Sequence, residues 1–294
     1  MSAPQILSGN SSNEESPEAT RLNVAGAMLS HQGLVRTLNE DVVIYRVPRP
    51  DDPVAHLGAM AVLADGMGGH AAGEVASQIA AQTIHLLYYQ QDQPVPAALM
   101  QAFAAANTVI YERGVADAEC AGMGTTCTVI VIRDNRLWLA HVGDSRAYIV
   151  RDGVIHQISE DHTLVAQLVR DGTLTPEQAS ISPDRNVLLR ALGTQPVIEP
   201  CIWDDGMLLI AGDVLILCSD GLHDLVDDAA ITDAVTRFAP FDACQTLIEA
   251  ALAAGGHDNV SVGVFAITAA TTAATTSDRP TRAIDLTALP GDIE

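Results

Sequence analysis

Short apolar runs rich in β-branched residues recur along the chain and predict strands. These runs lie at 60–63, 127–132, 137–141, 147–150, 207–210 and 214–218. Asp134-Asn135 and Asp152-Gly153 interrupt the middle runs and are typical of tight hairpin turns. The middle of the chain is therefore expected to form neighbouring antiparallel strands.

Three other segments carry apolar residues at a spacing of three to four, which predicts helices. They contain Val75, Ile79, Thr83 and Leu87; Leu99, Phe103, Ala106 and Ile110; and Leu247, Ala251 and Ala254. Strand and helix do not alternate simply, which argues against a doubly wound parallel sheet. Clustered hairpins with helices outside them favour an α+β fold of two antiparallel sheets covered by helices.

The two ends of the chain differ in composition from its middle. Residues 1–20 are rich in Ser, Asn and Glu, and residues 268–294 begin with a Thr/Ala tract, so both are expected to be disordered tails. One globular domain is expected over residues 21–267. No basic-then-apolar leader and no apolar run of about 18 residues is found, so we expect a cytoplasmic protein without membrane association.

Charge and residue usage exclude several kinds of chemistry. The formal net charge is −22, so nucleic-acid binding is set aside. All 15 basic residues are arginine. Without lysine the chain has no phosphate-loop lysine and no Schiff-base lysine. The five cysteines form no Cys-x-x-Cys pair, which indicates buried thiols in a reducing compartment instead of a zinc site or disulfides.

The strongest functional signal is a set of acidic residues at predicted strand ends. Asp65-Gly66 and Asp220-Gly221 follow apolar strands, and the set also contains Asp144, Asp258 and the pair Glu40-Asp41. A single Asp-Gly after a strand is usually only a turn, but their joint occurrence predicts converging carboxylates that need a cation. Oxygen ligands suit Mg²⁺ or Mn²⁺, and two such ions can activate water for attack on a phosphoryl group.

Two arginines near these carboxylates are given different roles. Arg36, four residues before Glu40, is the candidate phosphate ligand, because a guanidinium matches two phosphate oxygens; without that context it would be taken for a surface arginine. Arg146 is expected to form a structural ion pair with a loop carboxylate. Cys218 and Ser219 border the site but have no partner base in the sequence, so neither is expected to be a nucleophile.

Eight segments resemble the metal-dependent protein phosphatases of the protein phosphatase 2C (PPM) family, in particular its compact bacterial members. They occur in family order: GLVRTLNED (33–41), VLADGMGGHAAGEVAS (62–77), GMGTTCTV (122–129), AHVGDSRAY (140–148), ISEDHTL (158–164), NVLLRALG (186–193), LILCSDGLHDLV (215–226) and HDNVSV (257–262). The resemblance implies a four-layer α-β-β-α sandwich with a flap insert at about 162–190.

The resemblance also implies residue roles. Asp65 would bridge two Mn²⁺ or Mg²⁺ ions, with the Gly66 carbonyl on one of them, while Asp220 and Asp258 complete the shell of the other. Glu40 would act through metal-bound water, Asp41 would orient the attacking water, and Arg36 would bind the substrate phosphate. Asp144 with Asp220 would hold a third, weaker ion.

The function implied is hydrolysis of phosphoserine and phosphothreonine on proteins by direct attack of water, by a monomer that opposes a bacterial serine/threonine kinase. Two alternatives stay open at this point. One is a pseudo-phosphatase that uses the fold for binding, although every expected metal carboxylate is present. The other is a hydrolase of small phosphoesters or of a phosphorylated anti-sigma antagonist.

Three positions depart from the broader family pattern. Met67 stands where relatives outside bacteria often carry a histidine proposed as the general acid, and methionine cannot donate a proton. The acid is therefore unassigned between a metal-bound water and His70. His31-Gln32 replaces the usual acidic residue before Gly33, and Ser261 replaces a more common threonine.

Overall fold

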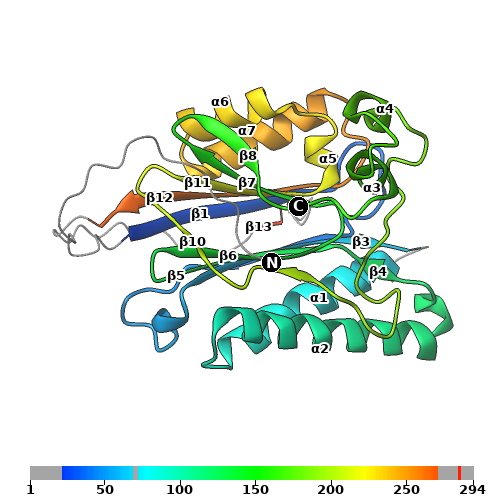
Figure 1. Ribbon diagram of the computed structural model, residues 1–294, viewed down its shortest axis with the longest axis horizontal. Helices are drawn as coiled ribbons and strands as arrows, with labels where there is room; N and C mark the ends of the chain where they lie inside the picture. The colour runs from blue at the N-terminus through cyan, green and yellow to red at the C-terminus, as the bar shows by residue number, and fades with distance from the viewer. Residues whose placement is uncertain (1–21, 69–71, 271–283, 286–294) are drawn as a thin grey trace, which may run out of the picture.

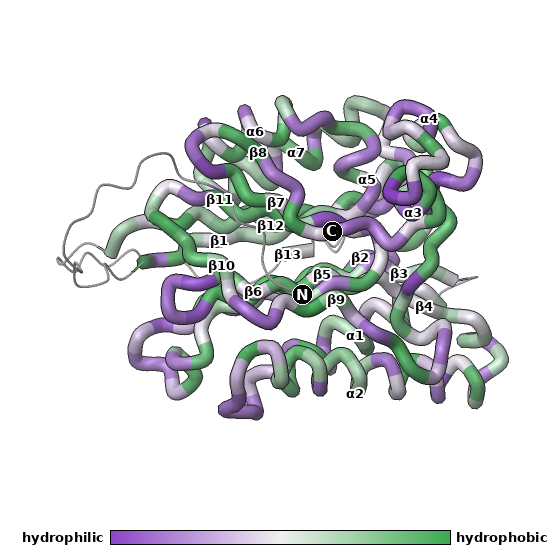
Figure 2. Tube along the Cα trace, in the orientation of Figure 1, coloured by the Kyte–Doolittle hydropathy of each residue, from purple (hydrophilic) through white to green (hydrophobic). Residues whose placement is uncertain are grey.

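The computed structural model describes residues 22–68, 72–270 and 284–285. Two sheets lie face to face, and helices cover the outer face of each (Figure 1). This is the predicted four-layer α-β-β-α sandwich. In Figure 2 the strands are coloured mostly hydrophobic, and much of the hydrophilic colour lies on the loops that join them.

The first sheet has six strands in the order β13-β1-β12-β11-β7-β8. Their bounds are β1 Leu22–His31, β7 Arg146–Arg151, β8 Val154–Gln157, β11 Val214–Cys218, β12 Val260–Ala269 and β13 Ile284–Asp285. All neighbours are antiparallel except β13, which pairs in parallel with β1. The predicted turn at Asp152-Gly153 joins β7 to β8, with φ of 53° and 76°.

The second sheet has seven strands, with the order β10-β6-β5-β3-β2 along its main path, while β4 pairs with β3 and β9 with β6. Their bounds are β2 Asp41–Arg46, β3 Ala59–Met67, β4 Gly124–Thr125, β5 Cys127–Arg133, β6 Arg136–Val142, β9 Cys201–Ile202 and β10 Met207–Leu208. Asp134 and Asn135, with φ of 51° and 58°, form the predicted hairpin turn between β5 and β6.

Helices α1 (Ala72–Tyr89) and α2 (Val95–Ala116) cover the second sheet, and α6 (Asp228–Arg237) and α7 (Pro240–Ala253) cover the first (Figure 1). Three apolar clusters fill the spaces between the four layers. The cluster between the two sheets includes Leu63, Leu139, Leu217 and Phe265. The short helix α5 (Asp220–His223) and the 3-10 turns η1 (Ala55–Leu57) and η2 (Ala118–Cys120) complete the core elements.

The segment predicted as a flap contains α3 (Leu164–Arg170) and α4 (Pro176–Ser180). Backbone hydrogen bonds close its base, from Leu164 N to Val187 O and from Leu189 N to His162 O, each 2.8 Å. The N-terminal caps of both helices are threonines, Thr163 and Thr175. The insert is thus a loop with a fixed base.

The buried face of α1 differs from the sequence pattern. The face of α1 turned to the sheet consists of Ala76, Ala80, Ile84 and Tyr88, each one position after the residue that the spacing predicted. The predicted residues Val75, Ile79 and Leu87 are half-buried beside that face. Small alanines allow the helix to pack closely on β3.

The predicted tails lie mostly outside the described residues. Residues 1–20 are outside them, whereas β12 runs two residues beyond the expected domain end, to Ala269. Ile284 and Asp285, within the second predicted tail, pair with Leu29 and Ser30. Of the helices in the described ranges, none is both long and apolar enough to cross a membrane.

Candidate metal centre

The two sheets bring the predicted carboxylates together at one edge of the sandwich. Asp41 begins β2 and lies opposite Asp65 near the end of β3. Asp220 begins α5 directly after β11, and Asp258 lies two residues before β12, both on the other sheet. Asp144 lies in the connection between β6 and β7, which passes from one sheet to the other.

Burial and mutual repulsion raise the pKa of these carboxyls. Burial is the larger cause for Asp65, whose pKa is raised well above its usual range, and Asp41, Asp220, Asp144 and Asp258 add to it. The pKa of Asp41 is raised to about 7 by burial, with further increases from Asp220 and Asp258. Burial and then Asp220 raise the pKa of Asp144 to about 7. These carboxylates are close enough to repel one another, and the cationic side chain paired with the group is that of Arg36, on Asp258.

Two buried carboxylate oxygens in this site have no hydrogen-bond partner, Oε1 of Glu40 and Oδ1 of Asp41. A buried charged acceptor without a hydrogen-bond partner is costly, so these two oxygens are suited to contact a bound cation or its water. The Glu40 carboxylate lies over the first turn of α1, where a Cβ on Gly73 would come within 2.3 Å of Oε1. A glycine is required at that position to leave room for it.

The donors fit a divalent ion that keeps several of its waters. In the described part of the chain, no three His, Cys, Asp or Glu side chains are gathered as the ligands of a single ion. Mg²⁺ is commonly held by one or two carboxylates, with water completing an octahedral shell, and Mn²⁺ accepts the same oxygen donors. The oxygen-only set of Glu40, Asp65, Asp220 and Asp258 matches that chemistry.

Backbone and hydroxyl groups hold Asp65 in place. Its N–H donates to Thr126 Oγ1 at 3.1 Å, and its carbonyl accepts from Thr126 N and Thr125 Oγ1, each at 2.8 Å. Gly66 N donates to the Glu40 carbonyl at 3.1 Å, which fixes β3 against the segment before β2. Asp65 therefore comes from a rigid strand end.

Ser219 orients Asp41, a role that the sequence analysis missed. Its Oγ donates to Asp41 Oδ2 at 2.8 Å and accepts from Ser261 N at 3.0 Å. Ser219 is completely buried, and its hydroxyl hydrogen is committed to that carboxylate. The neighbouring Cys218 is also buried, and burial raises the pKa of its thiol to about 12. Neither side chain has the character of an activated nucleophile.

Arg36 lies beside the carboxylates, half-exposed, on the segment between β1 and β2. Its Nη2 donates to Asp258 Oδ2 at 2.6 Å, and the two side chains are 48% and 35% exposed. Hydrogen bonding to Asp258 raises the pKa of the guanidinium, so it remains charged. The exposed part of this side chain is available to an anion arriving from solvent.

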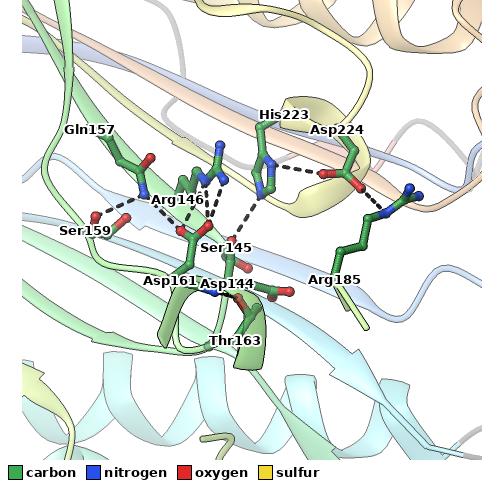
Figure 3. Close-up of polar contacts among 12 residues, drawn as sticks. Asp144, Ser145, Arg146, Gln157, Ser159, Asp161, Thr163, Arg185, His223 and Asp224 are labelled. Carbon is green, nitrogen blue, oxygen red and sulfur yellow. Dashed lines mark hydrogen bonds and ion pairs between the residues drawn. The ribbon is translucent and has the colours of Figure 1, made fainter. Parts of the chain in front are cut away.

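Arg146 has the structural role that was predicted for it (Figure 3). Its Nη2 and Nε donate to the Asp161 carboxylate at 2.7 and 3.1 Å, and Gln157 also donates to Asp161. Nearby, His223 Nε2 donates to the carbonyl of Asp144 at 3.1 Å, while the side chain of Arg185 from the flap approaches Asp224. These contacts line part of a cavity of about 750 Å³ between the flap and α5, which also reaches Asp144 and Asp220.

A sandwich of two antiparallel sheets with a strand-end carboxylate site defines the class to which this chain belongs. The protein phosphatase 2C family model matches residues 17–167. The serine/threonine protein phosphatase PstP of Mycobacterium tuberculosis is 43% identical over 242 residues, which are 81% of this chain and 44% of that protein. The protein phosphatase PhpP of Streptococcus pneumoniae is 36% identical over 247 residues, 82% of this chain and 96% of that protein. The chain belongs to the protein phosphatase 2C family.

The solved structures include a close match to the fold. The crystal structure of the catalytic domain of PstP in complex with two manganese ions is 40% identical, covers 84% of this chain and 100% of that domain, and has a TM-score of 0.74. This chain spans less than half of the full length of PstP.

Proposed function

We propose that this protein hydrolyses phosphoserine and phosphothreonine on other proteins, with two Mn²⁺ or Mg²⁺ ions. The observation that carries the proposal is the set of mutually repelling carboxylates, two of whose oxygens are buried without a partner. Similarity to the serine/threonine phosphatases PstP and PhpP, and to a PstP structure with two manganese ions, supports it.

Asp65 would bridge the two ions, with the Gly66 carbonyl on one, and Asp220 and Asp258 on the other. Glu40 would act through a water of the ion beside it, and Asp144 with Asp220 would hold a third, weaker ion. When bound, the ions supply an activated water and neutralise charge on the phosphoryl oxygens. We assign each residue by its place in the family motifs.

The chain's own groups then perform three tasks. Arg36 binds the phosphate from the open side of the site, where its guanidinium is half-exposed. Asp41, held through Oδ2 by Ser219, directs its other oxygen to the attacking water and accepts its proton. The cavity beside Asp144 and Asp220 leaves room for the substrate chain under the flap.

Attack is direct, without a phosphorylated protein intermediate, because Ser219 and Cys218 are buried and not activated. Catalysis then comes from positioning and charge neutralisation, as phosphoryl transfer generally requires. The proton for the leaving alcohol is not assigned to a side chain: Met67 cannot supply one, and His70 lies outside the described residues.

We also propose that it acts as a monomer in the cytoplasm and opposes a serine/threonine kinase. A single chain carries every residue of the site. The five cysteines are free thiols, which suits a reducing compartment.

The test is phosphate release from a phosphothreonine peptide with Mn²⁺, followed by the stereochemistry at phosphorus with a chiral phosphoryl substrate. One displacement by water inverts the configuration, whereas a phosphorylated intermediate retains it. We expect inversion; retention would contradict direct attack, and no release from any phosphopeptide would contradict the activity itself.

A further inference from the structure

Asn259 follows Asp258 and has a side chain whose hydrogen-bonding groups are all directed to one segment. It is 4% exposed. Its Oδ1 accepts from Glu40 N at 2.8 Å, and its Nδ2 donates to the carbonyls of Gln32 and Leu38, each at 2.8 Å. Both amide hydrogens are used, and the three partners are backbone groups of residues 32–40.

Residues 32–40 form neither helix nor strand and connect β1 to β2. A segment without a ladder of its own depends on a few contacts for its conformation. Gly33 has φ of +82°, and a Cβ on it would lie 2.1 Å from the Asp258 carbonyl oxygen, so its backbone packs directly on the Asp258 backbone. Leu34 N also donates to the Gly256 carbonyl at 2.8 Å.

In the sequence, Arg36 lies between Gln32 and Leu38, the two residues whose carbonyls accept hydrogen bonds from Asn259. Asn259 also accepts a hydrogen bond from the N–H of Glu40. One amide therefore fixes the start and the end of the segment that carries Arg36, and the backbone of Glu40. Arg36 reaches back to Asp258, the residue before Asn259. The Asn259 amide thus holds the backbone of residues 32–40, while the carboxylate of the preceding residue, Asp258, holds the Arg36 guanidinium.

We propose that Asn259 is a positioning residue that orients Arg36 for the substrate phosphate and Glu40 toward the metal centre; this rests on the proposed function. Asn259 does not touch the substrate. Its effect passes through Arg36, so removing the amide has a large consequence only while the guanidinium is present.

The chain offers a matched control in Asn107 on α2, which is 2% exposed. Its Oδ1 accepts from Gly193 N at 2.8 Å, and its Nδ2 donates to the carbonyls of Gln195 and Pro196 at 3.0 and 3.3 Å. Asn107 therefore makes the same three kinds of hydrogen bond as Asn259, but to a segment that carries no residue assigned to the site. Its removal costs a comparable number of buried hydrogen bonds.

The experiment is a double-mutant cycle on KM for a phosphothreonine peptide, with Asn259→Ala in the wild-type and Arg36→Ala backgrounds. We expect Asn259→Ala to raise KM about 10-fold in the wild type, which is about 1.4 kcal/mol, and less than 2-fold with Arg36→Ala. The coupling is the difference between the two backgrounds, at least about 5-fold in KM. Asn107→Ala should change KM less than 2-fold in both. Asn259→Asp, which keeps the acceptor for Glu40 N, replaces Asn259→Ala in the cycle if the alanine variant does not fold.

Amide hydrogen exchange of the metal-free protein supplies a readout that does not depend on activity. Exchange at Glu40 should become at least 10-fold faster in Asn259→Ala and stay unchanged in Asn107→Ala. Equal KM effects in both backgrounds, or unchanged exchange at Glu40, would overturn the positioning role. A wild-type chain inactive on all phosphopeptides would overturn the proposed function, and the positioning role with it.

Discussion

Asp41 and Asp65 lie directly opposite each other across the antiparallel pair of β2 and β3. Directly opposed like charges destabilise a sheet, and here both carboxyls have a raised pKa. The fold therefore accepts a local cost in order to place two carboxylates side by side, which is the usual mark of a site selected for binding instead of stability.

That cost leads to a first prediction, on Asp65→Asn. The substitution removes a buried charge that Asp41, Asp220 and Asp144 repel, so the metal-free variant should be about 1 kcal/mol more stable than metal-free wild type. Its phosphatase activity with Mn²⁺ should fall at least 100-fold. Thermal unfolding in chelator and phosphate release in Mn²⁺ measure the two effects, and a variant that keeps wild-type turnover contradicts the bridging role.

The second prediction concerns Arg36. Its loss removes a charged contact to phosphate worth roughly 1.5–3 kcal/mol. Arg36→Ala should raise KM for phosphopeptides at least 10-fold and lower kcat less, if the contact is equal in ground and transition states. Arg237→Ala is the control, because Arg237 is exposed and paired with Asp233 within α6. An unchanged KM would mean that Arg36 is a structural surface residue and does not bind the substrate phosphate.

A third prediction distinguishes metal binding by the Asp144 side chain from a role of this residue in shaping its turn. His223 binds the carbonyl of Asp144, and this contact survives in Asp144→Ala. We expect the variant to keep its melting temperature and the two tight ions, while turnover falls at least 10-fold. A crystal structure at high Mn²⁺ without density beside Asp144, together with normal kinetics of the variant, would mean that Asp144 only shapes the turn.

The fourth prediction is a dependence of stability on pH that comes from His141 and His162, whose ring centroids are 4.9 Å apart. Burial lowers the pKa of His141 to about 4 and that of His162 to about 3. His162 Nδ1 accepts from Gly143 N at 3.1 Å, and only the unprotonated nitrogen can do so. Both rings are therefore neutral in the folded protein at neutral pH.

The unfolded chain takes up these protons near pH 6.5, before the folded protein does, so stability is present above pH 6.5 and is lost as pH falls toward 4. At about 1.4 kcal/mol per pKa unit, His141 alone contributes about 3 kcal/mol. Burial raises the pKa of Asp41 and of Asp144 to about 7, which changes stability with pH in the opposite sense. The histidine contribution is therefore measured as the difference between wild type and His141→Gln in denaturant unfolding from pH 7 to pH 4. His141→Gln should reduce the slope, and the exposed His56 provides the control His56→Gln.

The strand-end carboxylates could be read from the sequence because each depends on a local pattern, a position at one end of an apolar run or beside a glycine. The Arg146 ion pair with a loop carboxylate was also predicted, although its partner, Asp161, was not named. Strand β1 escaped prediction, since it is rich in Ala and Gly, which are depleted in strands. It forms because β12 pairs with it along its whole length and the Phe265 ring occupies the space beside Gly26.

The groups that orient the site could not be found in the sequence. Ser219 meets Asp41 across 178 positions, and Asn259 meets Glu40 across 219, so only the folded chain brings them together. Their one sequence signal is adjacency, because each is next to a predicted metal ligand, Asp220 or Asp258. The partners, however, depend on the stacking of the two sheets.

That stacking gives the ions a second consequence, in the thermodynamics of folding. Asp41 and Asp65 belong to one sheet, while Asp220 and Asp258 belong to the other, so an ion shared between them would tie the two halves of the sandwich together. A ligand that binds only the folded state adds RT ln(1 + [L]/Kd), about 2.7 kcal/mol at a hundredfold excess over Kd. The cell's supply of divalent ions would then set the lifetime of the protein as well as its turnover.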